Sequence, residues 1–429
     1  MSAIIAATTA ADGTIVRETV RQRSLKLPIS LGVVAVLILL LALPAGRSGT
    51  SVFRLADRTS TLALPDVGVP TWQTVFICAL LLVLLAAYAT VQVARYRRVG
   101  LWLPIVFAFV AVFGFLTWSA ADGLVPVTGL LFGAVSLSVP LVFGALGGVI
   151  GERAGVVNVA IEAQFLLAAF SSALVASMTG SYVLGILAAM LGGALVAAAL
   201  ALFAIRYIVD QVIVGVVLNV LITGLTSFLH GALMRQNEAL FNTPPRLPRI
   251  AIPLLHDIPV LGPVLFNQTL IVYLMYIAVP LVAWALYRSR WGLRLRAVGE
   301  HPQAADTVGI KVNPTRFWNL LLAGSIAGIG GAYFTLGSVG AFDKEMTDGL
   351  GFIALAAVIF GGWDPIRATL AALLFGFSMN LETLLSNLGS PIPGEFMKML
   401  PYVVTVLAVV GFAGKVRAPA ADGKPYIKG

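Results

Sequence analysis

The stretch Gly349–Gly376, GLGFIALAAVIFGGWDPIRATLAALLFG, holds two apolar runs with a short polar break between them. The first run, 350–362, is too short to cross a bilayer, because a spanning helix needs about 20 apolar residues. The second run, 366–388, is long enough. The break, GGWDP at 361–365, ends the first run. A helix end at membrane depth is tolerated only against protein or a water-filled cavity. The stretch therefore predicts a helical membrane protein with a short, broken or tilted helix beside a cavity.

Apolar runs of the same kind follow one another along the whole chain of 429 residues. Apolar residues make up 59% of it and charged residues only 11%, where a soluble domain carries about 25%. A soluble fold could not bury so much apolar surface, so soluble classes are excluded. The single cysteine excludes a disulfide scaffold, and three scattered histidines predict no metal site. We predict an all-α polytopic membrane protein with about 10–12 transmembrane helices, from twelve segments: 28–45, 72–94, 101–118, 127–149, 155–177, 181–204, 209–229, 268–287, 317–340, 350–362, 366–388 and 399–414.

The distribution of basic residues predicts the orientation. With both termini cytoplasmic, 20 of the 28 lysines and arginines fall in cytoplasmic regions, as the positive-inside rule requires. The net charge of +9 thus reports topology and predicts no nucleic-acid partner. We predict cytoplasmic tails at 1–27 and 415–429. A cleaved signal peptide is an alternative for the basic N-terminal stretch, although the next loop lacks a clear small-residue cleavage site. The proline-rich external loop 230–267 is predicted to be ordered with little regular helix.

The longest cytoplasmic loop, 288–316, is predicted to contain a helix of its own. Pro302 stands where a helix begins, His301 can cap it, and Gly309 can end it. The pattern predicts a helix of about two turns over 302–308 at the membrane surface. Two interpretations fit. The loop is either a solvated connection whose arginines anchor the flanking helices, or a docking helix for a cytoplasmic partner.

Three stretches together resemble the permease subunits of ABC importers, in the branch for branched-chain amino acids, simple sugars and nucleosides. Gly151–Gln164, GERAGVVNVAIEAQ, resembles the segment E-R-x-G-x-x-N-x-x-x-E of that branch. Gly349–Gly376 resembles G-x-G-F-I-A-L-A-A-V-I-F-G-x-W-x-P, found chiefly in nucleoside-type members. Loop 288–316 resembles the loop that couples such permeases to their ATPase, through six residues: Gly299, Glu300, Pro302, Ala304, Ala305 and Gly309.

The resemblance covers residues from about 125 to 414, which implies a permease core at 121–414 and additional N-terminal transmembrane helices at 28–120. It implies a non-catalytic transmembrane subunit of the bacterial inner membrane, importing nucleosides or a related small polar solute by alternating access. Simple sugars and branched-chain amino acids are the alternative solutes. The implied partners are cytoplasmic ATP-binding subunits, a second permease subunit (a homologue or a copy), and an extracytoplasmic binding protein or lipoprotein.

No cofactor is expected in this chain. It has no G-x-x-x-x-G-K-[ST] phosphate loop, since GFAGK at 411–415 has two residues between its glycines where that motif has four, so ATP and magnesium are expected in the partner ATPase. Two other classes of function fit less well. A stand-alone secondary transporter would depend on intramembrane charges such as Glu162 and Glu382, and would leave the basic loop without a purpose. A membrane-embedded enzyme would need a nucleophile–base or metal constellation that the sequence does not offer.

Polar residues in the segment 155–177 are candidates for the substrate pathway. Asn158, Glu162 and Phe165 are spaced to share one face of a helix there. A carboxylate, an amide and an aromatic ring could hold ribose hydroxyls and stack on a base, in keeping with the resemblance. The alternative is that Glu162 pairs with Arg153 or caps a neighbouring helix end.

Two further segments carry pathway candidates. Asn219 lies in the segment 209–229, where polar residues often serve only as hydrogen-bonding contacts between helices. Ser378 and Glu382 are four residues apart in the segment 366–388. An outer gate or a contact with the binding protein is the functional interpretation of this pair, and a structural role is the alternative.

Overall fold

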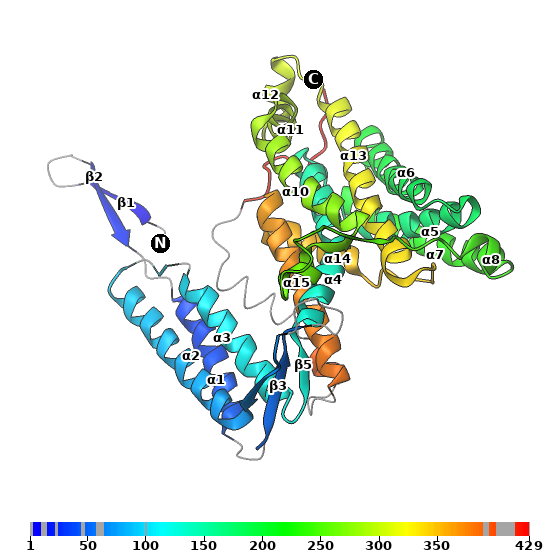
Figure 1. Ribbon diagram of the computed structural model, residues 1–429. Helices are drawn as coiled ribbons and strands as arrows, with labels where there is room; N and C mark the ends of the chain where they lie inside the picture. Colours follow the sequence, from blue (N-terminus) through cyan, green and yellow to red (C-terminus); the bar gives the residue numbers. More distant parts are fainter. Residues whose placement is uncertain are drawn as a thin grey trace. The chain divides into compact units, whose positions relative to one another are not determined.

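The computed structural model describes residues 3–9, 15–21, 25–43, 48–56, 64–97, 99–100, 102–388, 394–399 and 417–428. Across these ranges nine helices are long and apolar enough to cross a membrane, and two more apolar helices are shorter. The predicted all-α polytopic class is confirmed. The chain divides into two compact units, each drawn in Figure 1. The first comprises Met1–Thr59, Ala63–Val127 and Glu382–Gly414, and the second Ser60–Leu62, Thr128–Leu381 and Lys415–Gly429.

The first unit is built on three apolar helices that pack around buried Leu82, Leu103 and Phe107. A small sheet accompanies them, in which β3 pairs antiparallel with β4 and parallel with β5. An antiparallel hairpin of β1 and β2 lies within the region predicted as a cytoplasmic tail. The elements are β1 (Ala3–Thr9), β2 (Ile15–Arg21), α1 (Lys26–Ala42), β3 (Thr50–Arg54), β4 (Val67–Pro70), α2 (Thr71–Ala94), α3 (Trp102–Ser119) and β5 (Leu124–Pro126).

The second unit contains the longer helices, and several of them end in π-helical turns. Its elements begin with α4 (Val127–Arg153), α5 (Ile161–Thr179), α6 (Tyr182–Ala201) with turn η1 (Leu202–Arg206), α7 (Gln211–Leu229) with turn η2 (His230–Met234), α8 (Glu238–Phe241), β6 (Arg249–Ala251), α9 (Leu261–Leu265) and β7 (Asn267–Thr269). They continue with α10 (Leu270–Arg288), α11 (Arg290–Glu300), α12 (Pro302–Thr307), α13 (Val312–Ala332) with turn η3 (Tyr333–Val339), α14 (Leu350–Phe360) and α15 (Pro365–Asn387). A short helix, α16 (Gly394–Lys398), follows in the part of the chain that belongs to the first unit.

Small residues let the central helices of the second unit approach closely. α13 packs against α6, and both pack against α5. A Cβ atom on Gly193 of α6 would lie 2.1 Å from the carbonyl oxygen of Gly324 on α13. Such backbone proximity is typical of membrane helices, where packing of small residues replaces the hydrophobic drive. The same close approach explains why α13 has glycines at positions 324 and 328, where a Cβ would meet backbone carbonyls of α6.

Most predicted segments coincide with helices, with three differences. The predicted segment 28–45 corresponds to α1, which begins two residues earlier and ends three residues earlier than predicted. The predicted twelfth segment, 399–414, lies outside the described residues except for Met399. The predicted segment 155–177 is wrong at its start, because α5 begins only at Ile161. Residues 154–160 form a turn and an extended connection instead. There the Val157 amide donates to the Gln211 side chain over 2.7 Å, which holds the connection against α7.

Loop 230–267 agrees with its prediction of an ordered segment with little helix. It contains the turn η2, the two short helices α8 and α9, and the strand β6. β6 pairs antiparallel with β7, which places Arg249 opposite Thr269.

Candidate functional site

The short helix α14 is held at its N-terminus by Glu162 of α5. The Glu162 carboxylate accepts hydrogen bonds from the Thr347 hydroxyl (2.5 Å) and from the backbone amides of Gly349 (3.0 Å) and Gly351 (2.6 Å). These amides have no partner within the helix, and the helix dipole adds positive potential there, so a carboxylate stabilises this end. A Cβ on Gly351 would lie 2.3 Å from the Glu162 amide nitrogen, so a glycine is needed for this approach.

Glu162 therefore caps a neighbouring helix end, which is one of the alternatives that its sequence context left open. Arg153, the other alternative partner, forms its ion pair with Glu300. α14 itself has 11 residues, about 16 Å at 1.5 Å per residue, so it covers only about half of the hydrocarbon core. A role for Glu162 in the substrate pathway remains a prediction.

Asn158 and Asn219 fix the start of α5. Asn158 precedes α5 and so does not share its helical face, which corrects the predicted stripe of Asn158, Glu162 and Phe165. Its side-chain amide exchanges two hydrogen bonds, of 3.1 and 3.2 Å, with that of Gln164. Asn219 of α7 accepts from the Ala163 amide and donates to the Val159 carbonyl, both over 3.0 Å. Both side chains are buried and satisfy backbone or amide groups around the α5 N-terminus.

The remaining pathway candidates lie among packed side chains or on α15. The Phe165 ring is fully buried and meets Phe334 edge-on, with ring centroids 6.0 Å apart. Ser378 is buried and donates to the Leu374 carbonyl over 2.9 Å, within its own helix. Glu382 lies one turn further along α15 and is half-buried. No pathway role is tested by these positions, and each remains a prediction.

The helix predicted at 302–308 is confirmed as α12, which ends one residue earlier. Pro302 occupies its first position, and Gly309 follows with φ of +84°, a conformation that favours glycine. His301 stands at the N-cap position, but its side chain makes no capping hydrogen bond, so that detail of the prediction is wrong. Ala305 is buried against Val298 of α11 and Val312 of α13. Gln303 and Ala304 face outward and are exposed.

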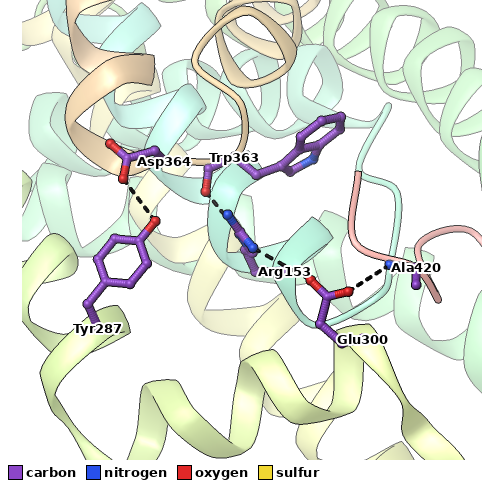
Figure 2. Close-up of polar contacts among 6 residues, drawn as sticks. All are labelled: Arg153, Tyr287, Glu300, Trp363, Asp364 and Ala420. Carbon is purple, nitrogen blue, oxygen red and sulfur yellow. Dashed lines mark hydrogen bonds and ion pairs between the residues drawn. The ribbon is translucent and has the colours of Figure 1, made fainter. Parts of the chain in front are cut away.

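Arg153, the last residue of α4, contacts both Glu300 at the end of α11 and the turn that follows α14 (Figure 2). Its Nε donates to the Trp363 carbonyl over 3.0 Å, in the turn between α14 and α15. Its Nη1 lies 3.8 Å from the Glu300 carboxylate, immediately before α12. A cation at a helix C-terminus also interacts favourably with the helix dipole. One guanidinium thus contacts the turn after α14 and the last residue of α11, Glu300, which lies two positions before the start of α12.

The same turn has two further polar contacts. The Trp363 indole N–H donates to the Glu152 carboxylate, and the Tyr287 hydroxyl donates to Asp364 over 2.8 Å (Figure 2 draws the latter). Side chains of α10 and α4 therefore both form hydrogen bonds with the turn between α14 and α15. The break at 361–365 is predictable from the sequence. Its partners are not, because Glu152 and Tyr287 lie 211 and 77 residues from the side chains they contact.

Gly299 allows loop 288–316 to lie against the end of α4. A Cβ there would stand 2.1 Å from the Arg153 carbonyl oxygen, so a glycine is required. Sequence reasoning did not identify Arg153, Gln164 or Trp363 as site residues. All three lie within the two stretches, 151–164 and 349–376, that resemble family motifs, and this position is the sequence feature that could have identified them.

Comparison with known proteins identifies the family of the chain. Residues 130–409 match the model of the family described as branched-chain amino acid transport system, permease component. The chain is 40% identical over 299 residues to the guanosine ABC transporter permease protein NupQ of Bacillus subtilis, covering 68% of this chain and 93% of NupQ. It is 41% identical over 304 residues to the nucleoside ABC transporter permease protein NupC of Lactococcus lactis, covering 68% and 94%.

A second permease protein of the same Lactococcus lactis nucleoside ABC transporter type, NupB, is 26% identical over 215 residues, covering 49% of this chain and 58% of NupB. No solved structure matches the chain. The family model covers well over half of the sequence, and the helices it spans include α5, α12 and α14. This chain is a multi-pass inner-membrane protein that belongs to the family of ABC transporter permease components of the branched-chain amino acid type.

Proposed function

We propose that the chain is the permease subunit of an ATP-driven importer of nucleosides, with guanosine among its solutes. The observation that carries the substrate class is the identity of 40–41% to NupQ and NupC, over 93–94% of their lengths. Those proteins are named for guanosine and for nucleosides. The chain itself supplies the path through the membrane and performs no chemistry on the solute.

The contacts of Arg153 support a mechanism for coupling. An ATP-binding subunit would press on the exposed face of α12, next to Glu300. The Glu300–Arg153 pair and the Arg153–Trp363 hydrogen bond would pass that displacement to the end of α14. Glu162 holds the other end of α14, so the helix would move as a body against α5. Solute release inward then requires only that the inward state binds solute more weakly than the outward state.

The proposal includes three kinds of partner. Cytoplasmic ATP-binding subunits hydrolyse ATP, and an extracytoplasmic binding protein or lipoprotein delivers the solute. A second permease subunit completes the pore. NupB and NupC, two permease proteins of one organism, support a second subunit that is a homologue rather than a copy.

Uptake of radiolabelled guanosine tests the substrate class. Cells that lack their own nucleoside transporters would express this chain with its ATP-binding and binding-protein partners. We expect uptake that unlabelled nucleosides abolish, and that excess glucose or leucine leaves unchanged. Uptake blocked by glucose or leucine alone would contradict the nucleoside assignment. Uptake that persisted without any ATP-binding subunit would favour a secondary transporter instead.

A further inference from the structure

Residues 417–428, here called the terminal strap, are bound against the coupling loop. The Ala421 amide donates to the Gly299 carbonyl over 2.9 Å, and the Ala420 amide donates to the Glu300 carboxylate over 3.2 Å, as Figure 2 shows for the latter. Tyr426 lies beside Gln303 and Ala304 of α12 itself, close enough to Asp306 to interact with its carboxylate. The strap therefore contacts both the residues that lead into α12 and α12.

A buried arginine donates hydrogen bonds to the backbone of the terminal strap. Arg316 of α13 is only 2% exposed, and its Nη1 donates to the Lys424 carbonyl over 2.8 Å. Its Nη2 lies 3.5 Å from the Ala421 carbonyl. Gly155, with φ of +88°, leaves room for this packing, because a Cβ there would lie 2.7 Å from the Arg316 guanidinium. Burying a cation is costly unless its donors are used, so this arrangement favours a strap with a defined position.

The strap and α12 form the two walls of a groove of about 570 Å³. Pro302 and Gln303 line one wall, and Lys424, Tyr426 and Ile427 line the other. Ile427 is 71% exposed, and Val308, directly after α12, is 74% exposed. The mixture of apolar and charged side chains is typical of an interface between separately folded proteins. Neither Ile427 nor Val308 belongs to a candidate membrane span.

α12 alone is too small to form a stable interface with another protein. A stable protein interface takes about 800 Å² and 20–30 residues from each partner. α12 has only six residues, of which Ala305 is buried. The strap places a dozen further residues directly beside it. We propose that the strap is the second half of the docking surface for the ATP-binding subunit, which contacts α12 and the strap together across this groove. This inference rests on the proposed function.

Site-specific cross-linking tests the two halves separately. The only cysteine, Cys78, is buried in α2, so single-cysteine variants can be built on Cys78→Ala. Gln303→Cys probes α12, Ile427→Cys probes the strap, and Leu254→Cys is a matched control that is 85% exposed in the loop 230–267. Each variant would carry a photoactivatable maleimide in membranes that contain the complete transporter.

We expect the ATP-binding subunit to cross-link from positions 303 and 427 and not from 254. Cross-linking from 303 alone would overturn the role of the strap and leave the proposed function standing. Cross-linking from neither 303 nor 427 would overturn docking at α12 as well. In a second measurement, Ile427→Glu should lower the ATP-binding subunit that co-purifies by about tenfold, as at a central interface residue. Leu254→Glu should leave it unchanged, and equal recovery in both variants would contradict the inference.

Discussion

The Glu162 carboxylate is stabilised inside the second unit by hydrogen-bond donors at a helix end. An ionised carboxylate at bilayer depth costs about 3 kcal/mol on insertion scales. Three donors from Thr347, Gly349 and Gly351 and the dipole of α14 offset that cost. The same bonds make the position of α14 depend on one side chain of α5.

We expect Glu162→Gln to lower nucleoside uptake by about tenfold, because a hydrogen bond to a charged group contributes about 1.5–3 kcal/mol. The neutral amide also presents its NH₂ group to backbone donors. Glu238→Gln, at an exposed position in α8, is the matched control. Uptake and the midpoint of thermal unfolding are measured on the same preparations, with co-purification of the ATP-binding subunit unchanged. Wild-type uptake in Glu162→Gln would remove Glu162 from both the pathway and the coupling machinery.

We predict that Asp422 makes the binding of the terminal strap depend on pH. Burial raises its pKa to about 7, against the opposing effects of the Gly423 amide and the Arg316 guanidinium. Its Oδ1 has no hydrogen-bond partner, and the Glu152 carboxylate lies close enough to interact with it. Because the pKa is higher in the bound strap than in a released one, the bound form takes up the proton. Binding is therefore strongest below the ordinary pKa of an aspartate and is lost as pH rises through about 7.

Hydrogen exchange of residues 417–428 between pH 5 and pH 8.5 measures this effect. After correction for the intrinsic rate, protection in the wild type should fall between pH 5 and about pH 7 and then level off. In Asp422→Asn, which remains neutral, protection should stay constant over the same range. A wild-type strap equally protected at pH 5 and pH 8.5 would show that Asp422 does not control its binding.

At the scale of elements, α14 is fixed at both ends by side chains from other helices. Glu162 of α5 holds its N-terminus, while Arg153 of α4 binds the turn that follows it. A short helix with two such attachments can shift as a rigid body when either attachment moves. Only the Arg153 end is connected to the coupling loop, through Glu300.

Arg153→Gln should therefore uncouple the transporter. We expect uptake per ATP hydrolysed to fall severalfold while the ATP-binding subunit still co-purifies, because α12 itself is unchanged. Arg153→Lys should recover part of the loss, since lysine keeps the charge but lacks the planar group that contacts two partners at once. Arg290→Gln, an exposed arginine of α11, is the control for lost positive charge. An unchanged ratio of uptake to hydrolysis in Arg153→Gln would exclude this connection.

Elements with a local sequence signal could be predicted, and contacts between distant segments could not. Pro302 and Gly309 mark the ends of α12 by their own backbone preferences, so its position follows from the sequence to within one residue. The start of α5 could not be placed, because Gln211 of α7, 54 residues away, accepts from the Val157 amide and so stabilises the non-helical connection 154–160. The partners of Glu162 could not be predicted from the sequence for the same reason, since its hydrogen-bond donors lie 185–189 residues away.

For the whole molecule, the family match begins near one of the boundaries between the two units. The family model begins at residue 130, close to the end of the stretch 63–127 in the first unit. NupQ and NupC each align with 68% of this chain while being nearly fully covered themselves. α5, α12, α14 and the terminal strap all lie in the second unit. The proposed pathway and coupling groups are thus concentrated in the unit that carries most of the family match.

The composition of the pore is the prediction that concerns the complete assembly. This chain is 41% identical to NupC over 94% of that protein, but only 26% identical to NupB over 58%. The two permease proteins of that organism thus differ in how closely they resemble this chain. A pore built from two unlike permeases gives each subunit one coupling helix and one pathway wall. We therefore expect one copy of this chain in each transporter, beside a second subunit more similar to NupB.

Co-expression of two differently tagged copies of this chain with its partner subunits measures the number of copies. Purification through the first tag should recover the ATP-binding subunit and another permease, and none of the second tag. Mixing separately expressed, solubilised samples controls for exchange after lysis. Recovery of the second tag together with the first, at the mass of two 45.1 kDa chains, would establish a homodimeric pore. In that case both coupling helices would be identical, and Arg153→Gln would disable both halves of the pore at once.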